Sequence, residues 1–276
     1  MSEPLLRVSN LKKHFPVLGG LLSREVGQVY AVDGVSFAVD RGETLGLVGE
    51  SGCGKSTTGR CVLRLIEPTS GEVVFDGQSV TGLGGGDLRA MRRNMQLVFQ
   101  DPFASLNPRM TVGAILGEPF IIHNLVTSAS EREDRVANLL VKVGLKAEHM
   151  RRYPHEFSGG QRQRIAIARA LIVEPQILAL DEAVSALDVR VRAQILSLLD
   201  DLSERLGLAY LFVTHDLSVV RAATDRLLVM QNGKVVETGE TAAVFAAPRH
   251  PYTRTLLAAT PDLERALAAR AAQVAL

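Results

Sequence analysis

The sequence has few cysteines, almost no net charge and no long apolar segment, and each absence excludes a class of protein. Only two cysteines occur, Cys53 and Cys61, so the chain has no disulfide framework and fits a reducing compartment. The formal net charge of +1 gives no field that would attract nucleic acid or an anionic membrane. No run approaches the roughly 18 apolar residues of a membrane span, the N-terminus lacks the features of a signal peptide, and the scattered histidines show no zinc-ligand spacing. We therefore expect a soluble, cytosolic protein.

The order of apolar runs predicts an α/β fold. With 276 residues and 46% hydrophobic content, the chain can bury a substantial core. Short apolar or alternating runs predict strands at residues 5–8, 32–39, 44–48, 72–75, 95–99, 177–180 and 209–214, with a hairpin at 227–237 around Asn232-Gly233. From residue 103 to about 156 the pattern is helical, which indicates an inserted helical subdomain. Elsewhere the alternation of strands and helices predicts a mainly parallel sheet that is covered on both faces.

A glycine-rich loop is the most informative feature of the chain. It reads Gly-Glu-Ser-Gly-Cys-Gly-Lys-Ser-Thr and lies between the apolar run 44–48 and a helix predicted at 58–66. Its backbone N–H groups and the positive helix end favour phosphate, Lys55 would reach the β- and γ-phosphates, and the Ser56 hydroxyl would ligate Mg²⁺. We expect the nucleotide-binding residues of the loop to be Gly49, Glu50, Ser51, Gly52, Cys53, Gly54, Lys55, Ser56 and Thr57.

The loop also predicts a reactive thiol at Cys53. This residue precedes Lys55 at the start of a helix, where a neighbouring cation and the positive helix end favour the thiolate. An ordinary, small loop residue is the alternative. Cys61 falls inside the helix, where we expect a packed and inert thiol.

Four polar residues follow predicted strands and are candidates for the chemistry of the site. Gln100 ends the run 95–99 and would offer an oxygen to Mg²⁺. The strand 177–180 leads into Asp181, suited to indirect Mg²⁺ coordination, and Glu182, suited to polarising the attacking water. His215 follows the run 209–214 and would contact the γ-phosphate. Each residue taken alone has an ordinary structural explanation, as a solvated loop or strand-end residue.

A second helix start is also suited to an anion. Ser158 is a good N-cap, and Gly159, Gly160 and Gln161 open the helix that follows. Two phosphate-binding helix ends about a hundred residues apart are most simply explained if the second one faces the nucleotide of a neighbouring subunit. Asp188 is placed to cap the next helix and also to take part in this site.

Taken together, these motifs resemble the ATP-binding subunit of an ABC transporter, over about residues 5–260. The loop matches the Walker A motif of that family, Gln100 its Q-loop, 157–161 its signature and 177–181 its Walker B strand. Glu182 then corresponds to the catalytic glutamate, 185–188 to the D-loop and His215 to the switch histidine. Lys55, Gln100, Glu182 and His215 are the implied catalytic residues, and Ser56, Gln100 and Asp181 the implied metal ligands. Phe15 corresponds to the aromatic residue that stacks on adenine, with Tyr30 as the weaker candidate.

The resemblance implies a P-loop NTPase (RecA-like) core with an antiparallel β subdomain and a helical subdomain inserted at about 103–165. The motif His250-Pro251-Tyr252-Thr253 and the residues after Gln100 resemble ATPases of oligopeptide, dipeptide and nickel importers, with a C-terminal extension at 245–276. The insert between Phe15 and Tyr30 resembles the second ATPase of a two-ATPase system.

Such a subunit would bind ATP and Mg²⁺ at the cytoplasmic face of the inner membrane. Its partners would be two integral membrane permease subunits, a second homologous ATPase and an extracytoplasmic solute-binding protein, without nucleic acid. Peptide, nickel, opine and glutathione remain possible cargoes.

Two alternatives are weaker. A non-transport ABC ATPase acting on nucleic acid or ribosomes usually carries two cassettes or long coiled-coil inserts, and neither is present. A P-loop kinase or switch GTPase leaves 157–161 and the placement of His215 unexplained.

Overall fold

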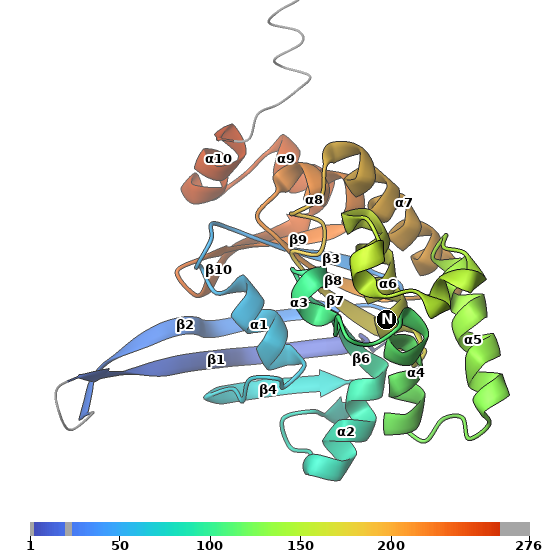
Figure 1. Ribbon diagram of the computed structural model, residues 1–276. Helices are drawn as coiled ribbons and strands as arrows, with labels where there is room; N and C mark the ends of the chain where they lie inside the picture. Colours follow the sequence, from blue (N-terminus) through green and yellow to red (C-terminus); the bar gives the residue numbers. More distant parts are fainter. Residues whose placement is uncertain (1–2, 20–23, 260–276) are drawn as a thin grey trace, which may run out of the picture.

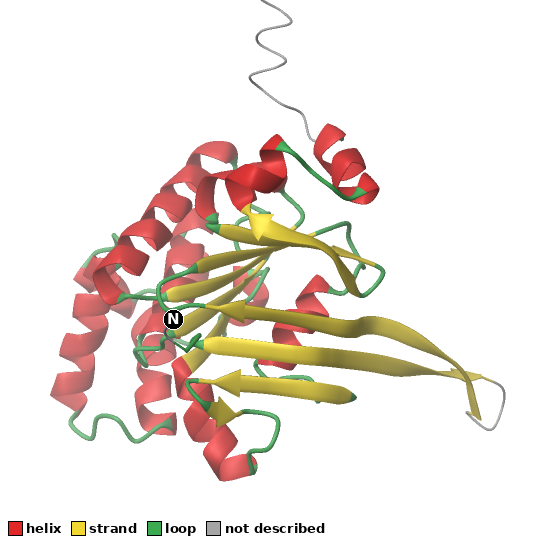
Figure 2. Ribbon diagram, turned by 180° about the vertical axis from the view of Figure 1, so that it is seen from behind, coloured by secondary structure: helices red, strands yellow, loops and turns green. Residues whose placement is uncertain are grey.

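The computed structural model, described here for residues 3–19 and 24–259, is built around two sheets with helices on both sides (Figures 1 and 2). The central sheet has six strands in the order β10-β9-β3-β8-β7-β6. Five are parallel, and β10 runs antiparallel to β9 at one edge. Their bounds are β3 Thr44–Val48, β6 Met95–Val98, β7 Ile177–Asp181, β8 Ala209–Thr214, β9 Arg226–Gln231 and β10 Lys234–Glu240.

The central strands are buried on both faces, so their side chains divide between two cores. On β7 and β8, Leu178, Leu180 and Phe212 belong to a core shared with α6, α7 and the helical insertion. Their neighbours Ala179 and Leu211 belong to a second core, shared with α1 and the other sheet. This period of two is the direct result of the pleat, in which successive side chains point to opposite faces. The predicted mainly parallel sheet covered on both faces is confirmed.

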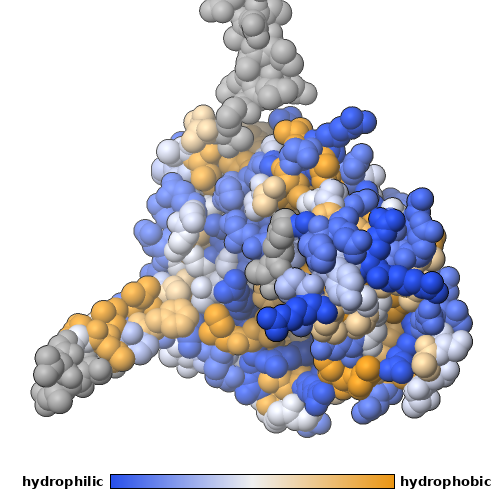
Figure 3. Space-filling view, viewed as in Figure 1, coloured by the Kyte–Doolittle hydropathy of each residue, from blue (hydrophilic) through white to orange (hydrophobic). Residues whose placement is uncertain are grey.

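The second sheet is antiparallel, with the order β2-β1-β4-β5. Its strands are β1 Leu6–Gly19, β2 Arg24–Val39, β4 Ser70–Phe75 and β5 Gln78–Ser79. β1 and β2 are much longer than the strands predicted at 5–8 and 32–39, and together they project from the body as an arm (Figure 1). Apolar side chains lie exposed along the arm (Figure 3), among them Leu18 at 60% and Val26 at 68% exposure. The strand signal is weak in the outer part of the arm, at 13–19 and 26–31, because no side chain described there is buried and nothing imposes alternation.

The helices and 3₁₀ turns connect these strands and cover them (Figure 1). The α-helices are α1 Lys55–Val62, α2 Gly85–Asn94, α3 Pro102–Ser105, α4 Val112–Ile122, α5 Ala129–Lys142, α6 Gly159–Leu171, α7 Val189–Leu206, α8 Leu217–Ala223, α9 Thr241–Ala246 and α10 Pro251–Ala258. Two 3₁₀ turns, η1 Ala147–Arg151 and η2 Pro154–Glu156, precede α6. Residues from 103 to 158 form no strand, so the segment is helical as predicted.

Two predicted boundaries differ from those in the structure. The helix expected at 58–66 begins at Lys55 and ends at Val62, because the phosphate loop passes directly into the helix and Arg64 takes a positive φ of 50°. The predicted turn at Asn232-Gly233 is confirmed, with both residues at positive φ between β9 and β10. Of the C-terminal extension expected at 245–276, residues 260–276 lie outside the described part.

Candidate functional site

The glycine-rich loop joins β3 to α1 at the carboxyl edge of the central sheet. Gly54 has a φ of 105° and lies so close to the arm that an added Cβ would be 2.0 Å from the carbonyl oxygen of Ala31. Gly49 is similarly restricted, since a Cβ there would be 2.2 Å from the carbonyl oxygen of Met230. Only glycine fits either position without backbone movement. The loop is therefore a tightly enclosed cradle between the arm and β9.

The end of the loop presents donors for an anion. In the described structure, no side chain caps the start of α1, so the N–H groups of its first turn are available to a ligand. Lys55 is buried, and its Nζ donates to the carbonyl oxygens of Gly49 and Glu50 at 2.8 Å each. A buried ammonium held at the mouth of a glycine loop is a phosphate-binding arrangement. The chemistry of these donors fits the phosphates of a nucleotide.

The structure corrects the prediction made for Cys53. Its side chain is buried, and burial raises the pKa of the thiol even though Lys55 Nζ lies 3.8 Å from Sγ and opposes the shift. The expected depression of the pKa is therefore wrong, because desolvation of the thiolate outweighs the neighbouring charge. Cys61 is packed as expected, and burial raises its pKa to about 11.

The strand-end residues singled out in the sequence meet in one cluster beside the loop. Gln100 Nε2 donates to Glu182 Oε2 at 2.8 Å, and His215 Nδ1 lies 3.0 Å from Glu182 Oε1. Glu182 thus has each carboxylate oxygen held by a different side chain. Its φ of 50° turns the chain sharply after β7, and its own N–H donates to the carbonyl of Val213 at 2.8 Å. We refer to Gln100, Glu182 and His215 as the Glu182 clamp.

Asp181 lies next to the clamp and faces the start of α1. Its carboxylate accepts a hydrogen bond from Ser56 Oγ at 2.6 Å and one from an Arg60 guanidinium nitrogen at 3.2 Å. A hydroxyl beside a carboxylate, open to phosphate oxygens, is a donor set that suits Mg²⁺. Gln100, the third predicted metal ligand, uses its amide nitrogen on Glu182, which leaves Oε1 as the oxygen available to a cation. The residues present therefore fit the metal predicted from the sequence.

Sequence reasoning missed Arg60. It forms an ion pair with Asp181 across 121 residues of sequence, and Asp181 is almost fully buried. A signal was present, because Ser56 and Arg60 are four residues apart on one helix and so share a face. Arg60 places a positive charge beside the carboxylate that we assign to the metal site.

The second helix start does not contact the loop within this chain. Ser158 Oγ accepts from the N–H of Gln161 at 3.4 Å, and Gln161 Oε1 accepts from the N–H of Ser158 at 3.1 Å, a capping box at the start of α6. Gly160 lies against α7, where an added Cβ would be 2.4 Å from a methyl of Val191. Among the described residues, no hydrogen bond or ion pair joins 158–161 to residues 49–57.

The remaining predicted site residues lie at other places. Asp188 caps α7, with Oδ1 accepting from the N–H of Val191 at 2.9 Å, which is the capping role expected for it. Phe15 and Tyr30 lie on the arm, both partly exposed. Lys13 Nζ is 4.9 Å from the centre of the Phe15 ring, and the Tyr30 ring packs edge-on against His14. Tyr30 precedes Ala31, whose carbonyl borders the loop, so both aromatic candidates stay open.

Two family models match the chain. The model described as ABC transporter matches residues 32–185, more than half of the chain. The model for the C-terminal region of oligopeptide and dipeptide transporters matches residues 236–275, which include α10.

Named relatives are similar over most of the sequence. The glutathione import ATP-binding protein GsiA of Pectobacterium atrosepticum is 55% identical over 260 residues, which cover 94% of this chain and 42% of that protein. The oligopeptide transport ATP-binding protein AppF of Bacillus subtilis is 53% identical over 260 residues, with 94% of this chain and 79% of that protein covered. The chain thus spans less than half the length of the GsiA relatives.

Solved structures share the fold. The ATP-binding cassette MJ0796, in a dimeric post-hydrolysis state bound to ADP and Pi, has a TM-score of 0.75 and 31% identity over 86% of this chain and 98% of its own. The cbiO1 protein of Clostridium perfringens, part of the ABC transporter complex cbiONQ, has a TM-score of 0.75 and 29% identity over 89% of this chain and 92% of its own. The P-loop α/β fold predicted from the sequence is confirmed by these neighbours.

Proposed function

We propose that this chain hydrolyses ATP as the motor subunit of an importer. The chain belongs to the ABC transporter family of ATP-binding proteins. The observation that carries the proposal is the position of the Glu182 clamp. It lies directly beside the phosphate loop and beside the oxygens of Ser56 and Asp181, which suit Mg²⁺. The names of the relatives favour a peptide-type solute such as an oligopeptide or glutathione.

In this proposal each residue of the site has a separate task. The loop N–H groups and Lys55 would bind the β- and γ-phosphates, while Ser56, Asp181 and Gln100 would hold Mg²⁺. Bound Mg²⁺ would neutralise charge on the phosphate oxygens. The Glu182 carboxylate orients the attacking water and accepts its proton, because Gln100 and His215 fix both carboxylate oxygens in place. His215, at the end of β8, also contacts the γ-phosphate.

Substitution of the glutamate tests this assignment. Glu182→Gln keeps the shape of the side chain but removes the group that orients water, so turnover should fall by about 10²–10⁴-fold, while ATP binding stays at the parental level. The measurement is ATP hydrolysis and ATP affinity of the chain reconstituted with its membrane partners. Glu204→Gln, an exposed position on α7, is the matched control and should leave both values unchanged. Near-parental hydrolysis by Glu182→Gln would refute the assignment.

The completed site would need a second cassette. Ser158–Gln161 form a helix N-terminus that is suited to bind an anion, and they make no hydrogen bond to this chain's own loop. We therefore place this helix N-terminus against the nucleotide of a partner ATPase. The ATP site would then lie between two chains, arranged head to tail. We expect the partner to be a second homologous ATPase rather than an identical copy, and Phe15 or Tyr30 to stack on adenine.

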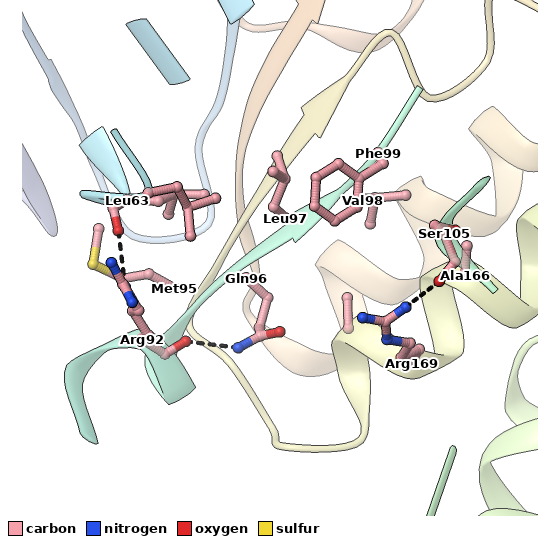
Figure 4. Close-up of a pocket in the computed structure, with 12 residues that line it drawn as sticks. Leu63, Arg92, Met95, Gln96, Leu97, Val98, Phe99, Ser105, Ala166 and Arg169 are labelled. Atoms are coloured by element: carbon pink, nitrogen blue, oxygen red, sulfur yellow. Dashed lines mark hydrogen bonds between the residues drawn. The ribbon is translucent and has the colours of Figure 1, made fainter. Parts of the chain in front are cut away.

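The permease subunits would contact a groove near Gln100. A cavity of about 180 Å³ is lined by Arg92 of α2, Leu97 of β6 with Phe99 just after it, and Arg169 of α6 (Figure 4). Leu65, in the turn after α1, also lines it. Arg169 donates to the carbonyl of Ser105, which ties the start of the helical insertion to α6. β6 and Phe99 lead directly into Gln100. A displacement of this groove by a bound permease would therefore move Gln100 and change its hydrogen bond to Glu182.

The transport role has its own test. Among the described residues, no helix is long and apolar enough to cross a membrane, so the proposal requires membrane partners. We place the chain peripherally at the cytoplasmic face, with two integral permeases and an extracytoplasmic solute-binding protein in the same system. Leu65→Asp, in the groove and away from Glu182, should abolish ATP-driven uptake of labelled peptide or glutathione into reconstituted vesicles while ATP binding persists. Uptake at the parental rate would contradict the groove assignment.

A further inference from the structure

The C-terminal extension contacts the phosphate loop through a residue that the proposed mechanism does not use. The N–H of Glu50, the second residue of the loop, donates to the hydroxyl oxygen of Tyr252 at 3.1 Å. The two residues are 202 positions apart in the sequence. Tyr252 belongs to α10, which lies at the edge of the molecule next to the C-terminal end of the described chain (Figure 1).

The start of α10 is held in place by a buried carboxylate. Glu237 on β10 accepts hydrogen bonds from the N–H of Arg249 at 2.7 Å and of His250 at 2.9 Å. His250 Nδ1 in turn accepts from the N–H of Tyr252 at 3.2 Å and caps the helix. Hydrogen bonds that two successive amides donate to a charged carboxylate are among the stronger ones in a protein. These bonds therefore hold in place the backbone from which the Tyr252 side chain extends.

The Tyr252 ring is also packed beside the loop. It contacts an apolar cluster that includes Val48, the residue immediately before the loop, together with Leu217, Val220, Leu227, Val229 and Val244. Leu257 of the same helix packs on this cluster as well. Tyr252 thus packs on the apolar cluster to which Val48 belongs, while its hydroxyl accepts from the N–H of Glu50.

The carbonyl group of Glu50 is bound by Lys55, the lysine assigned to the phosphates. Its carbonyl oxygen accepts from Lys55 Nζ at 2.8 Å and from the N–H of Cys53 at 3.3 Å. Tyr252 holds the N–H of Glu50, and Lys55 holds the C=O. Any shift of α10 would therefore move the backbone on which the Lys55 ammonium rests.

We propose that Tyr252 is a positioning residue for the phosphate loop, and that residues 249–258 form a strap linking nucleotide binding to the docking of the C-terminal extension. The proposal rests on the proposed ATP-binding function and adds a coupled element to that site. Coupling of binding free energies is reciprocal. If the strap favours the nucleotide-binding loop conformation, bound nucleotide stabilises the strap by the same factor.

The first test separates the hydroxyl from the packing. Tyr252→Phe keeps the ring but removes the acceptor for Glu50, and a net hydrogen bond of this kind corresponds to about a 3- to 10-fold change in an equilibrium constant. We expect the Kd for ATP and the KM for hydrolysis to rise by that factor and Tm to fall slightly, with kcat unchanged, since among the described residues no bond joins Tyr252 to the Glu182 clamp. Tyr210→Phe is the matched control, because it removes a tyrosine hydroxyl that donates to the carbonyl of Leu199 at 2.8 Å, outside the strap and the loop: it should lower Tm and leave the Kd unchanged.

The second test uses amide hydrogen exchange on the full chain. Exchange of the Glu50 amide should be faster in Tyr252→Phe than in the parent. Addition of ATP should slow the α10 amides of the parent by the same 3- to 10-fold and should leave those of Tyr252→Phe unchanged. A purely structural role for Tyr252 predicts no such response of α10 to ATP.

The outcomes separate this proposal from the function on which it rests. A parental chain that fails to bind ATP refutes the proposed function. A Tyr252→Phe chain that binds ATP as tightly as a competent parent, with unchanged Glu50 exchange, refutes the strap. An equal loss of affinity in Tyr210→Phe also refutes it, since the effect would then belong to a general loss of stability rather than to the contact with Glu50.

Discussion

The addition of one methyl group should lower the thermal stability of the chain at Gly54, just before α1, and raise it at Gly59, inside that helix. Gly54 has a φ of 105°, and its new Cβ would lie 2.0 Å from the carbonyl oxygen of Ala31, about 1.4 Å inside ordinary contact. Gly59 lies five residues later inside the helix, where a Cβ would be 3.7 Å from a methyl of Val213. The pair therefore compares a steric requirement of the loop with ordinary helix propensity.

The structure allows the size of each effect to be worked out. At Gly54, the disfavoured φ costs about 1–3 kcal/mol and relief of the overlap costs about 1–3 kcal/mol. Together they amount to about 2–6 kcal/mol, or a fall in Tm of about 4–24 °C for a domain of this size. At Gly59, alanine stabilises a helix interior by about 0.8–1 kcal/mol relative to glycine, which raises Tm by about 2–4 °C.

Thermal unfolding with and without MgATP measures both consequences. Gly54→Ala should melt below the parent and should lose the stabilisation that ATP gives, because the loop cannot keep its conformation. Gly59→Ala should melt above the parent and keep the full ATP-induced shift. If Gly54→Ala melted with the parent and still responded to ATP, the reasoning about the enclosed cradle would be wrong.

The remaining predictions concern the thiols and a helix cap. Burial raises the pKa of Cys53 and of Cys61, so both should react slowly with maleimide near neutral pH and faster as the pH rises, and rapid labelling of Cys53 at pH 7 in a peptide map would contradict this. Although burial raises the pKa of Asp216, its bonds to Ser218 and its pairing with Arg192 outweigh burial and leave that pKa below the ordinary value of 3.8. The stabilisation is then present above that value and is lost as the pH falls through the lower folded pKa. Asp216→Asn should therefore reduce the free energy of unfolding by about 0.5–1 kcal/mol at pH 7, and the difference should shrink as the pH falls below 3.8. A difference in urea unfolding that does not shrink with falling pH would contradict this.

The predictable part of the site came from local signals on separate segments. The glycine loop and the residues after β6, β7 and β8 were visible in the sequence because each is defined by its immediate neighbours. Parallel strands then bring their carboxyl ends to one edge, which is why Gln100, Glu182 and His215 meet. The topology of the sheet, rather than any one motif, converts these signals into a site.

The parts that could not be predicted depend on burial or on distant partners. The direction of the Cys53 pKa shift is set by how deeply the loop is enclosed, and that enclosure comes from Ala31 and Met230. Arg60 pairs with Asp181 across 121 residues, and Tyr252 reaches Glu50 across 202. Local sequence patterns do not indicate which distant residues will pair, because those pairings depend on the fold.

The central claim is that the phosphate loop of one chain and the Ser158 helix start of another enclose the same nucleotide. Its most direct test is the mass of the Glu182→Gln chain in solution by light scattering, with MgATP and with ADP. A second copy of the chain carries the same two surfaces as the homologous partner, so at high protein concentration the account predicts a two-chain particle with MgATP and a single chain with ADP or without nucleotide.

Two further substitutions, made in that same variant, complete the measurement. Ser158→Glu places a negative charge at the helix start that should face the γ-phosphate, and it should abolish the two-chain particle. Ser128→Glu makes the same change at the equivalent cap of α5 and should leave the particle intact. A single chain with bound MgATP, or a two-chain particle that survives Ser158→Glu, would contradict the account.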